Sequence, residues 1–214
     1  MTDASSIAAG NAHTCAIVKA GAQVVCWGAN DAGQLGDGTT EKRSAPVVVK
    51  GVTGVKQLAL GVHHSCALRN DGSVTCWGSL GKAGAPAAIA GIPRADQLAS
   101  MQSSACARSG KTVRCWGGAY GAPMVVKELE GASDVVGAHV VGHELACAIL
   151  ADGVVDCILD QTSYKITNDE DTKTHTKARL VAVGAGAGCY VRDDASQQLD
   201  CDEELKVRAV VQQL

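Results

Sequence analysis

Ten cysteines are the most reactive side chains in this sequence of 214 residues. They form five pairs, each 9 to 12 residues apart: Cys15 and Cys26, Cys66 and Cys76, Cys106 and Cys115, Cys147 and Cys157, and Cys189 and Cys201. An even number at regular spacing is typical of a disulfide framework. Buried reduced thiols are an alternative. Zinc is a weaker one, because no CxxC occurs and the thiols would face each other in pairs rather than in sets of four.

Histidines are the second set of candidate ligands. His13 and His64 both stand two residues before the first cysteine of their pair, where Ser104, Leu145 and Ala187 stand in the other units. Because this position is not a histidine in the other three units, we do not expect a metal site built from one histidine of every unit. We interpret His13 and His64 as structural hydrogen-bonding groups.

A second pair, His139 and His143, is followed by Glu144. Four-residue spacing suits zinc on a helix, but in the HExxH motif the glutamate follows the first histidine. The residues between them, Val140 to Gly142, have the pattern of a strand. We therefore predict no metal site.

No Ser/His/Asp or Cys/His set suited to nucleophilic catalysis can be assembled, and cysteines in disulfides would not act as nucleophiles. Gly33, Gly36 and Gly38 could suggest a phosphate-binding loop, but no Gly-Lys-Ser follows them, and they are interpreted as turn formers. We predict no catalytic residue, no cofactor and no enzymatic activity.

The cysteine pairs must be positioned by β-hairpins. Between Cys66 and Cys76 a three-residue loop ending in Gly72 joins two short runs, and such a loop is a favoured hairpin connection. Its register places the two cysteines directly opposite each other. Opposed residues in a non-hydrogen-bonded pair have Cα atoms about 4.5 Å apart, within reach of a disulfide. We expect each bridge to close within one hairpin.

Tryptophans follow three of the second cysteines, at Trp27, Trp77 and Trp116. Alternation along a strand places them on the face opposite the cysteines. We predict that they pack between neighbouring units; a ligand-stacking platform is the alternative.

Two further apolar runs precede each hairpin, such as residues 47–49 and 55–60 in the second unit. Four short strands per 40 residues is the pattern of a propeller blade. The chain enters at residues 7–10, which we interpret as the second strand of a unit, and leaves through residues 206–211, where a next first strand would begin. We therefore predict an all-β fold, a β-propeller of five four-stranded blades closed by the C-terminal strand joining the N-terminal blade. Residues 1–6 are expected to be disordered and residues 7–214 to form a single domain.

Composition limits the possible partners and location. A net charge of -3 gives no excess of positive charge of the kind that binds nucleic acid. The sequence contains no run of 18 apolar residues, so no membrane-spanning helix is predicted. Disulfides persist in oxidising compartments. We expect an extracellular, periplasmic or cell-surface protein, whose signal or anchor is not present in this sequence.

Residues 10–39 read GNAHTCAIVKAGAQVVCWGANDAGQLGDGT, and residues 61–78 read GVHHSCALRNDGSVTCWG. Both runs resemble the regulator of chromosome condensation repeat family. The resemblance implies a β-propeller, commonly of seven blades with units near fifty residues, that binds proteins on one face. Relatives include a nucleotide exchange factor for a small GTPase and a β-lactamase inhibitor, and bacterial members with paired cysteines resemble exported proteins. Here only five units are present, and the last four are shorter after Cys-Trp-Gly.

We therefore predict a non-enzymatic protein-interaction scaffold that acts as a monomer on a protein partner. One alternative is a metal-dependent carbohydrate-binding or hydrolytic propeller that uses His139 or His143 with the acidic segment; another is an arc of a larger seven-bladed surface protein. Partner contact is predicted in the loops at residues 30–44 and 161–177. The candidate residues are Asn30, Gln34, Asp37, Arg43, Tyr120, Tyr164, Asp169, Glu170 and Asp171.

Overall fold

The structure is a computed structural model that describes residues 3–81, 85–140, 143–150, 155–159, 162–165, 178–184, 187–192 and 199–202. These residues form five antiparallel sheets, numbered here in chain order. Sheet 1 contains β1 (Ala4–Ala9), β2 (His13–Val18), β3 (Gln23–Gly28) and β4 (Arg43–Val48). Sheet 2 contains β5 (Val55–Leu60), β6 (His64–Arg69), β7 (Val74–Gly78) and β8 (Ala87–Ala88). Sheet 3 contains β9 (Gln97–Ser100), β10 (Ser104–Ser109), β11 (Thr112–Gly117) and β12 (Gly121–Val125).

The remaining elements continue the pattern. Sheet 4 contains β13 (Asp134–Val140), β14 (His143–Ile149), β15 (Val155–Leu159) and β16 (Thr162–Lys165). Sheet 5 contains β17 (Ala178–Gly184), β18 (Ala187–Arg192) and β19 (Leu199–Asp202). Two short 3-10 helices, η1 (Lys19–Gly21) and η2 (Lys127–Leu129), lie in connections.

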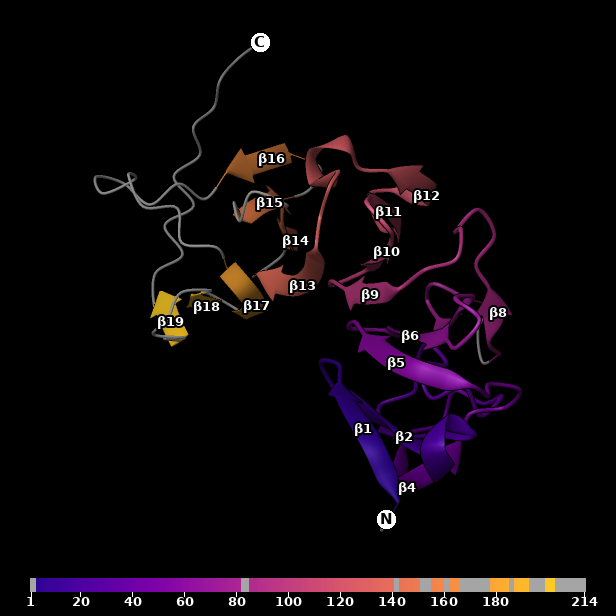
Figure 1. Cartoon of the computed structure of the whole chain (residues 1–214). Coiled ribbons are helices and arrows are strands. Elements are labelled where there is room, and N and C mark those ends of the chain that lie inside the picture. Colours follow the sequence, from indigo (N-terminus) through magenta and orange to yellow (C-terminus); the bar gives the residue numbers. More distant parts are fainter. Residues whose placement is uncertain are drawn as a thin grey trace.

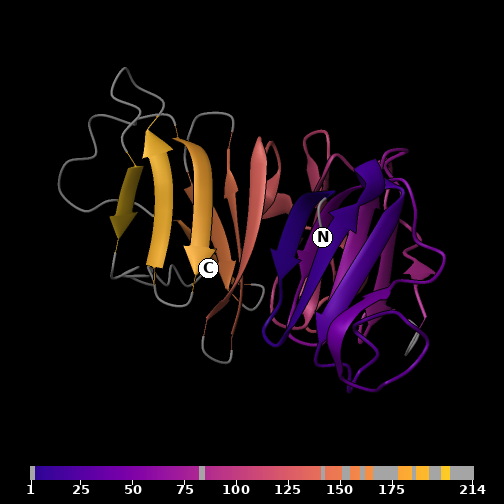
Figure 2. The same cartoon turned by 90° about the horizontal axis from the view of Figure 1, so that it is seen from below.

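The sheets follow one another around an arc, with the first strand of each on the inside (Figure 1). The inner strands contact each other in sequence, β1 with β5, β5 with β9, β9 with β13 and β13 with β17. Figure 2 shows the same sheets stacked face to face. This arrangement of four-stranded antiparallel sheets is that of a β-propeller.

The predicted hairpins and their register are confirmed in the first three sheets. Cys66 lies opposite Cys76, and Gly72 of the connecting loop has a φ of 84°, the left-handed conformation that favours glycine. Disulfides join Cys15 to Cys26, Cys66 to Cys76 and Cys106 to Cys115, with Cα atoms 4.1, 4.1 and 4.0 Å apart. The backbone register continues in sheets 4 and 5, which place Cys147 opposite Cys157 and Cys189 opposite Cys201.

The division of the chain into units differs from the expected one. The sequence pattern predicts that residues 47–49 belong to the second unit, but Val47 lies opposite Cys26, and β4 completes sheet 1. Each sheet therefore starts with the strand before its hairpin and ends with the strand after it. β1 begins at Ala4, within the segment expected to be disordered. Because sheet 1 has four strands of its own, the reason for expecting a C-terminal strand to complete it is removed; residues 206–211 lie outside the described residues.

Packing between sheets alternates along the strands. The Cys66–Cys76 disulfide is in the apolar cluster that faces sheet 3, whereas Trp77, the next residue, is in the cluster that faces sheet 1. Trp116 likewise packs toward sheet 2. Ile158 is buried toward sheet 3, at the position that follows the second cysteine in sheet 4. The prediction that the tryptophans pack between units is confirmed for Trp77 and Trp116.

Candidate functional site

The long loop between β3 and β4, residues 29–42, is a tightly hydrogen-bonded structure. Gly33, Gly36 and Gly38 have φ values of 77°, 66° and 85°, so their interpretation as turn formers is confirmed. The Ala29 amide donates to the carbonyl of Ala12, which anchors the start of the loop to the β1–β2 turn. The glycine turns and this backbone hydrogen bond therefore contribute to the path of the loop independently of its side chains.

Asn30 is the central polar residue of the loop. Its side chain is 1% exposed. Its Nδ2 donates to the carbonyl oxygens of Thr39 and Glu41, each at 3.0 Å, and its Oδ1 accepts from the Leu35 amide at 2.9 Å. A buried amide that satisfies backbone groups on both sides of a loop holds the two sides together.

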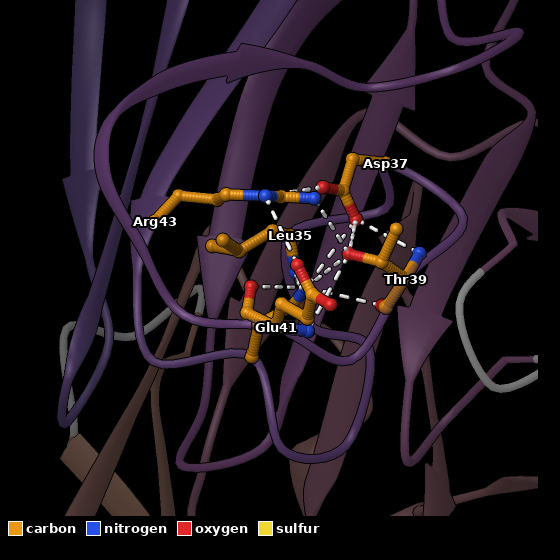
Figure 3. Close-up of polar contacts among 6 residues, drawn as sticks. Leu35, Asp37, Thr39, Glu41 and Arg43 are labelled. Atoms are coloured by element: carbon orange, nitrogen blue, oxygen red, sulfur yellow. Dashed lines mark hydrogen bonds and ion pairs between the residues drawn. The ribbon is translucent and has the colours of Figure 1, made fainter.

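Asp37 is the second organising residue, and Figure 3 shows its contacts with Thr39 and Arg43. Its Oδ1 accepts from the amide and the hydroxyl of Thr39 at 2.9 and 2.7 Å, and its Oδ2 accepts from Arg43 Nε at 3.0 Å. Desolvation by itself would raise the pKa of Asp37, but the hydrogen bonds from Thr39, Arg43 and Asn30 together hold that pKa below its usual value. Arg43 is thus fixed in one orientation at the base of β4.

Gln34 connects the loop to sheet 2. Its side chain accepts from the Ala32 amide and donates to Asp31, while its backbone carbonyl accepts from Ser65 Oγ at 2.9 Å and from Trp77 Nε1 at 2.8 Å. The loop of one sheet is therefore bonded to the hairpin of the next, which makes the loop part of the junction between sheets.

The histidines predicted to be structural are confirmed in that role. His13 Nε2 lies 2.8 Å from Ser65 Oγ, and His64 Nε2 lies 3.3 Å from Ser100 Oγ, each across a sheet junction. Desolvation, with repulsion from neighbouring histidines, lowers the pKa of His13 to about 4 and that of His64 to about 3. Both imidazoles are therefore neutral at pH 7.

Charged side chains remain exposed around this scaffold. Asp31 lies 3.5 Å from His63 Nδ1 across the junction of sheets 1 and 2, and Glu41 lies 3.3 Å from Arg43 Nη1. The side chains of Asp31, Glu41 and His63 are more than half exposed, and that of Arg43 is about one-third exposed. A hydrogen bond from Gln34 is the main cause that lowers the pKa of Asp31. We call Asp31, Glu41, Arg43 and His63 the loop rim.

The candidate residues of the sequence analysis other than Arg43 divide into three groups. Asn30, Gln34 and Asp37 are buried, and their polar atoms hold the loop together, so they do not present a contact surface. Tyr120 is also buried, in the cluster between sheets 3 and 4. Tyr164 lies in β16, opposite Cys157. Asp169, Glu170 and Asp171 lie outside the described residues.

Only Arg43 of that set belongs to the loop rim. Asp31 and Glu41 lie within the predicted contact loop at residues 30–44 but are not among the named candidates, and His63 lies outside that loop. Asp31 directly follows Asn30, and His63 directly precedes His64. The one feature of the sequence that could have indicated them is that each is a polar residue next to a residue of the repeat motif. Nothing in the sequence separates an exposed neighbour from a buried one in an irregular loop, because such a loop has no periodicity.

A different polar junction joins sheets 3 and 4. The buried carboxylate of Glu144 accepts from the Ser103 amide at 2.8 Å and from the hydroxyls of Ser103 and Ser104. His139 and His143 lie on the paired strands β13 and β14, with Val140 opposite His143. Helical zinc-binding spacing therefore does not apply to them. Among the described residues no cluster of three or more His, Cys, Asp or Glu residues could hold a metal ion.

In the described part of the chain, neither η1 nor η2 has the length or the apolar character needed to cross a membrane.

Comparison with known families matches residues 23–68 and residues 4–34 to the regulator of chromosome condensation (RCC1) repeat. The chain is similar to protein pim1 of Schizosaccharomyces pombe, with 35% identity over 88 residues, which is 35% of this chain and 16% of that protein. It is also similar to the probable E3 ubiquitin-protein ligase HERC4 of Homo sapiens, with 40% identity over 75 residues, or 34% of this chain and 7% of HERC4. The chain thus matches only a small part of these relatives.

Solved structures share the fold. Prp20p of Saccharomyces cerevisiae, studied for its binding to Gsp1p and histones, is 19% identical with a TM-score of 0.72, covering 92% of this chain and 56% of Prp20p. The ectodomain of the receptor kinase ACR4 of Arabidopsis thaliana is 22% identical with a TM-score of 0.59, covering 93% of this chain and 62% of that ectodomain. The chain spans little more than half the length of both structures.

Proposed function

This chain carries repeats of the regulator of chromosome condensation family, and on that premise we propose that it is a non-enzymatic protein-interaction module whose contact site is the loop rim. The observation that carries the proposal is the buried network of Asn30, Asp37 and Gln34, which holds a 14-residue loop in one conformation while Asp31, Glu41 and Arg43 stay accessible. Preorganised charges lose little conformational freedom on binding, which favours recognition.

The chemistry of the loop rim indicates a partner surface with both signs of charge. Arg43 can donate to a carboxylate, and Asp31 and Glu41 can accept from lysine or arginine side chains. A protein surface offers such a mixture, and Prp20p, which shares the fold, binds the proteins Gsp1p and histones. The ligase name of HERC4 is not carried over, because the match covers 7% of that protein.

The experiment compares capture of partners by the native chain and by two variants. The first carries Asp31→Ala, Glu41→Ala and Arg43→Ala; the matched control carries Lys127→Ala, Glu128→Ala and Glu130→Ala, three exposed charges near η2. We expect a protein captured by the native chain to be retained by the control and lost from the loop-rim variant at equal folded concentration. Equal capture by all three chains would contradict the assignment of the site.

We propose that the protein acts in an oxidising location, outside the cell, in the periplasm or at the cell surface. Support comes from the three disulfides between opposed hairpin positions, because disulfides persist in oxidising compartments. Protein taken from its native compartment and denatured directly in an alkylating reagent tests this, because the cysteines are buried in the folded chain. Alkylation of the cysteines only after reduction in denaturant is expected, whereas thiols that are alkylated in denaturant without reduction would contradict the proposal.

We also propose that the five sheets form one domain with the shape of an open arc. Sheet 1 is complete without a strand from elsewhere in the chain, and the sheets follow one another along the arc in Figure 1. Small-angle scattering of the dilute protein should match an arc. A scattering curve that fits only a closed five-bladed ring would contradict this shape.

A further inference from the structure

A chain of hydrogen bonds runs from the buried imidazole of His13 to the long loop between β3 and β4. His13 Nε2 lies 2.8 Å from Ser65 Oγ, and Ser65 Oγ donates to the Gln34 carbonyl at 2.9 Å. Because a carbonyl only accepts, the single hydroxyl proton of Ser65 is used in that bond. The Ser65 oxygen therefore accepts from His13, and the neutral imidazole carries its proton on Nε2.

The second ring nitrogen of His13 has no hydrogen-bond partner among the described residues. The residue is 3% exposed, and the part of the ring that bears Nδ1 faces Gly10, where a Cβ atom would come within 2.8 Å of that nitrogen. A further proton can be added only at Nδ1, because Nε2 already carries one. Protonation in the closed structure would thus bury a charged N–H group without an acceptor, which is unfavourable.

The titratable groups that act on His13 come from the long loop and from sheet 2. Asp31 belongs to the loop, whereas His63 and His64 belong to the β5–β6 turn and to β6. Desolvation is the largest cause that lowers the pKa of His13, and repulsion from His63 adds to it. The backbone of His64 and the charge of Asp31 act in the opposite direction without reversing the shift. The neutral imidazole is therefore favoured while the junction between sheets 1 and 2 is closed.

The long loop is anchored on both sides of this junction. The amide of Ala29, at the start of the loop, donates at 2.8 Å to the Ala12 carbonyl of the β1–β2 turn in its own sheet. Toward sheet 2, the Gln34 carbonyl accepts from Ser65 Oγ and from Trp77 Nε1. Opening of the junction would leave the loop on sheet 1 and break both bonds to Gln34. The indole N–H of Trp77 therefore reports directly on the opening.

We propose that protonation of His13 opens this junction at the end where the long loop lies, and so makes the loop rim sensitive to acid. Opening brings the imidazole into water, where the charged form is stable. The rim then divides, because three of its members belong to the loop and His63 belongs to sheet 2. A partner that contacts both sides binds only the closed form, so acid and partner act on one opening in opposite directions. The effect on the partner rests on the function proposed above, whereas the opening does not.

His64 provides the matched control, because it occupies the same position in sheet 2. It is fully buried, and its Nδ1 also lacks a partner in the described part of the chain. Its Nε2, however, lies 3.3 Å from Ser100 Oγ, across the junction of sheets 2 and 3. Glutamine at either position keeps a donor in place of Nε2 and does not titrate. The two variants therefore differ in the junction that they affect.

Hydrogen exchange of the oxidised full chain, followed by NMR at pH 7 and pH 5, tests the opening. The protection of the Trp77 indole N–H is its exchange rate relative to that of a free indole at the same pH. The pKa of His13 is about 4 in the closed junction and returns to about 6.5 in the open one. Protection in the native chain should therefore fall roughly twentyfold between pH 7 and pH 5. His13→Gln should abolish most of this fall, and His64→Gln should keep it.

Three results would overturn the proposal. The first is a native chain whose Trp77 indole is equally protected at both pH values. The second is a fall that persists in His13→Gln. The third is an equal effect of the two variants, which would show that the indole exchanges through unfolding of the whole chain rather than through this junction.

The protein captured by the native chain at pH 7 tests the effect on the loop rim. At pH 5 and at ten times its dissociation constant, it should raise the protection of the Trp77 indole roughly tenfold, because it binds the closed form alone. A bound partner that leaves this protection unchanged would overturn the acid sensitivity of the rim. If no protein is captured, the proposed function is contradicted, while the exchange measurement still decides whether the junction opens.

Discussion

At the scale of single residues, the long loop shows polar side chains used for structure rather than for contact. Asn30 and Asp37 belong to the glycine-rich motif, yet both are buried and bonded within the loop. The exposed charged side chains of the loop are their neighbours. The residues of the motif therefore supply the frame of the loop, and the proposed contact residues are their neighbours.

Replacing Asn30 by alanine should destabilise the protein by about 2 kcal/mol, because the buried Leu35 amide and the partly buried carbonyls of Thr39 and Glu41 would lose their partner. Asp31→Ala is the control, since Asp31 is exposed, and it should change the free energy of unfolding by less than about 0.5 kcal/mol. Urea denaturation without reductant measures both. Similar values for the two variants would show that the Asn30 network contributes little.

The buried histidines predict a loss of stability in acid. The unfolded chain takes up protons at His13 and His64 as the pH falls through about 6.5, whereas the folded chain resists until about 4 and about 3. Their contribution is complete above pH 6.5 and is lost as the pH falls toward the folded values. At pH 5 the loss is about 2 kcal/mol for each histidine. The double variant His13→Gln and His64→Gln should unfold with a smaller dependence on pH between 7 and 5; an unchanged dependence would exclude these residues as its cause.

At the scale of the elements, the cystine hairpin is the unit from which each sheet is built. The cysteines of the first three hairpins are fully buried between sheets. A reductant can therefore reach these disulfides only when the junction between the sheets opens. In the chain-entropy model, closing a loop of about ten residues contributes roughly 2 to 3 kcal/mol.

Cys66→Ala with Cys76→Ala should therefore lower the free energy of unfolding by about 2 to 3 kcal/mol while leaving the fold in place. Mass spectrometry of the native chain should show alkylation at all ten cysteines only after reduction in denaturant. Rapid reduction of the folded protein by dilute thiol would mean that the junctions open more readily than their burial implies.

Neighbouring sheets are joined by tryptophan as well. Trp77→Ala should cost about 4 kcal/mol, because a large buried side chain and its hydrogen bond to the Gln34 carbonyl are lost. Trp27→Ala removes the same side chain from a partly exposed position and should cost less than half as much. Thermal unfolding compares the two, and equal losses would contradict the assigned difference in packing.

At the scale of the whole molecule, the arc has two kinds of surface. Loops at the ends of the strands carry the charged loop rim, and the outward face of sheet 1 carries the exposed apolar side chain of Ile7. The loop rim is the surface proposed for a protein partner.

Local rules were enough to predict the hairpins, their register and the disulfides within them. A glycine-containing turn between two strands leaves one register available, and that register decides which cysteines meet. Alternation along the strand then decides that Trp77 and Cys76 face opposite sides. These features depend on residues that are close in the sequence, which is why the sequence alone determined them.

Tertiary structure decided which sheet each outer strand joins and which polar residues are exposed. β4 could pair with the hairpin before it or with the strand after it, and both choices satisfy the same apolar pattern; contacts with β3 settle the choice. Asn30 and Asp31 are equally polar, but one faces the interior of a folded loop and the other faces solvent. The free energy of such choices comes from surfaces brought together by distant parts of the chain, and no local pattern records it.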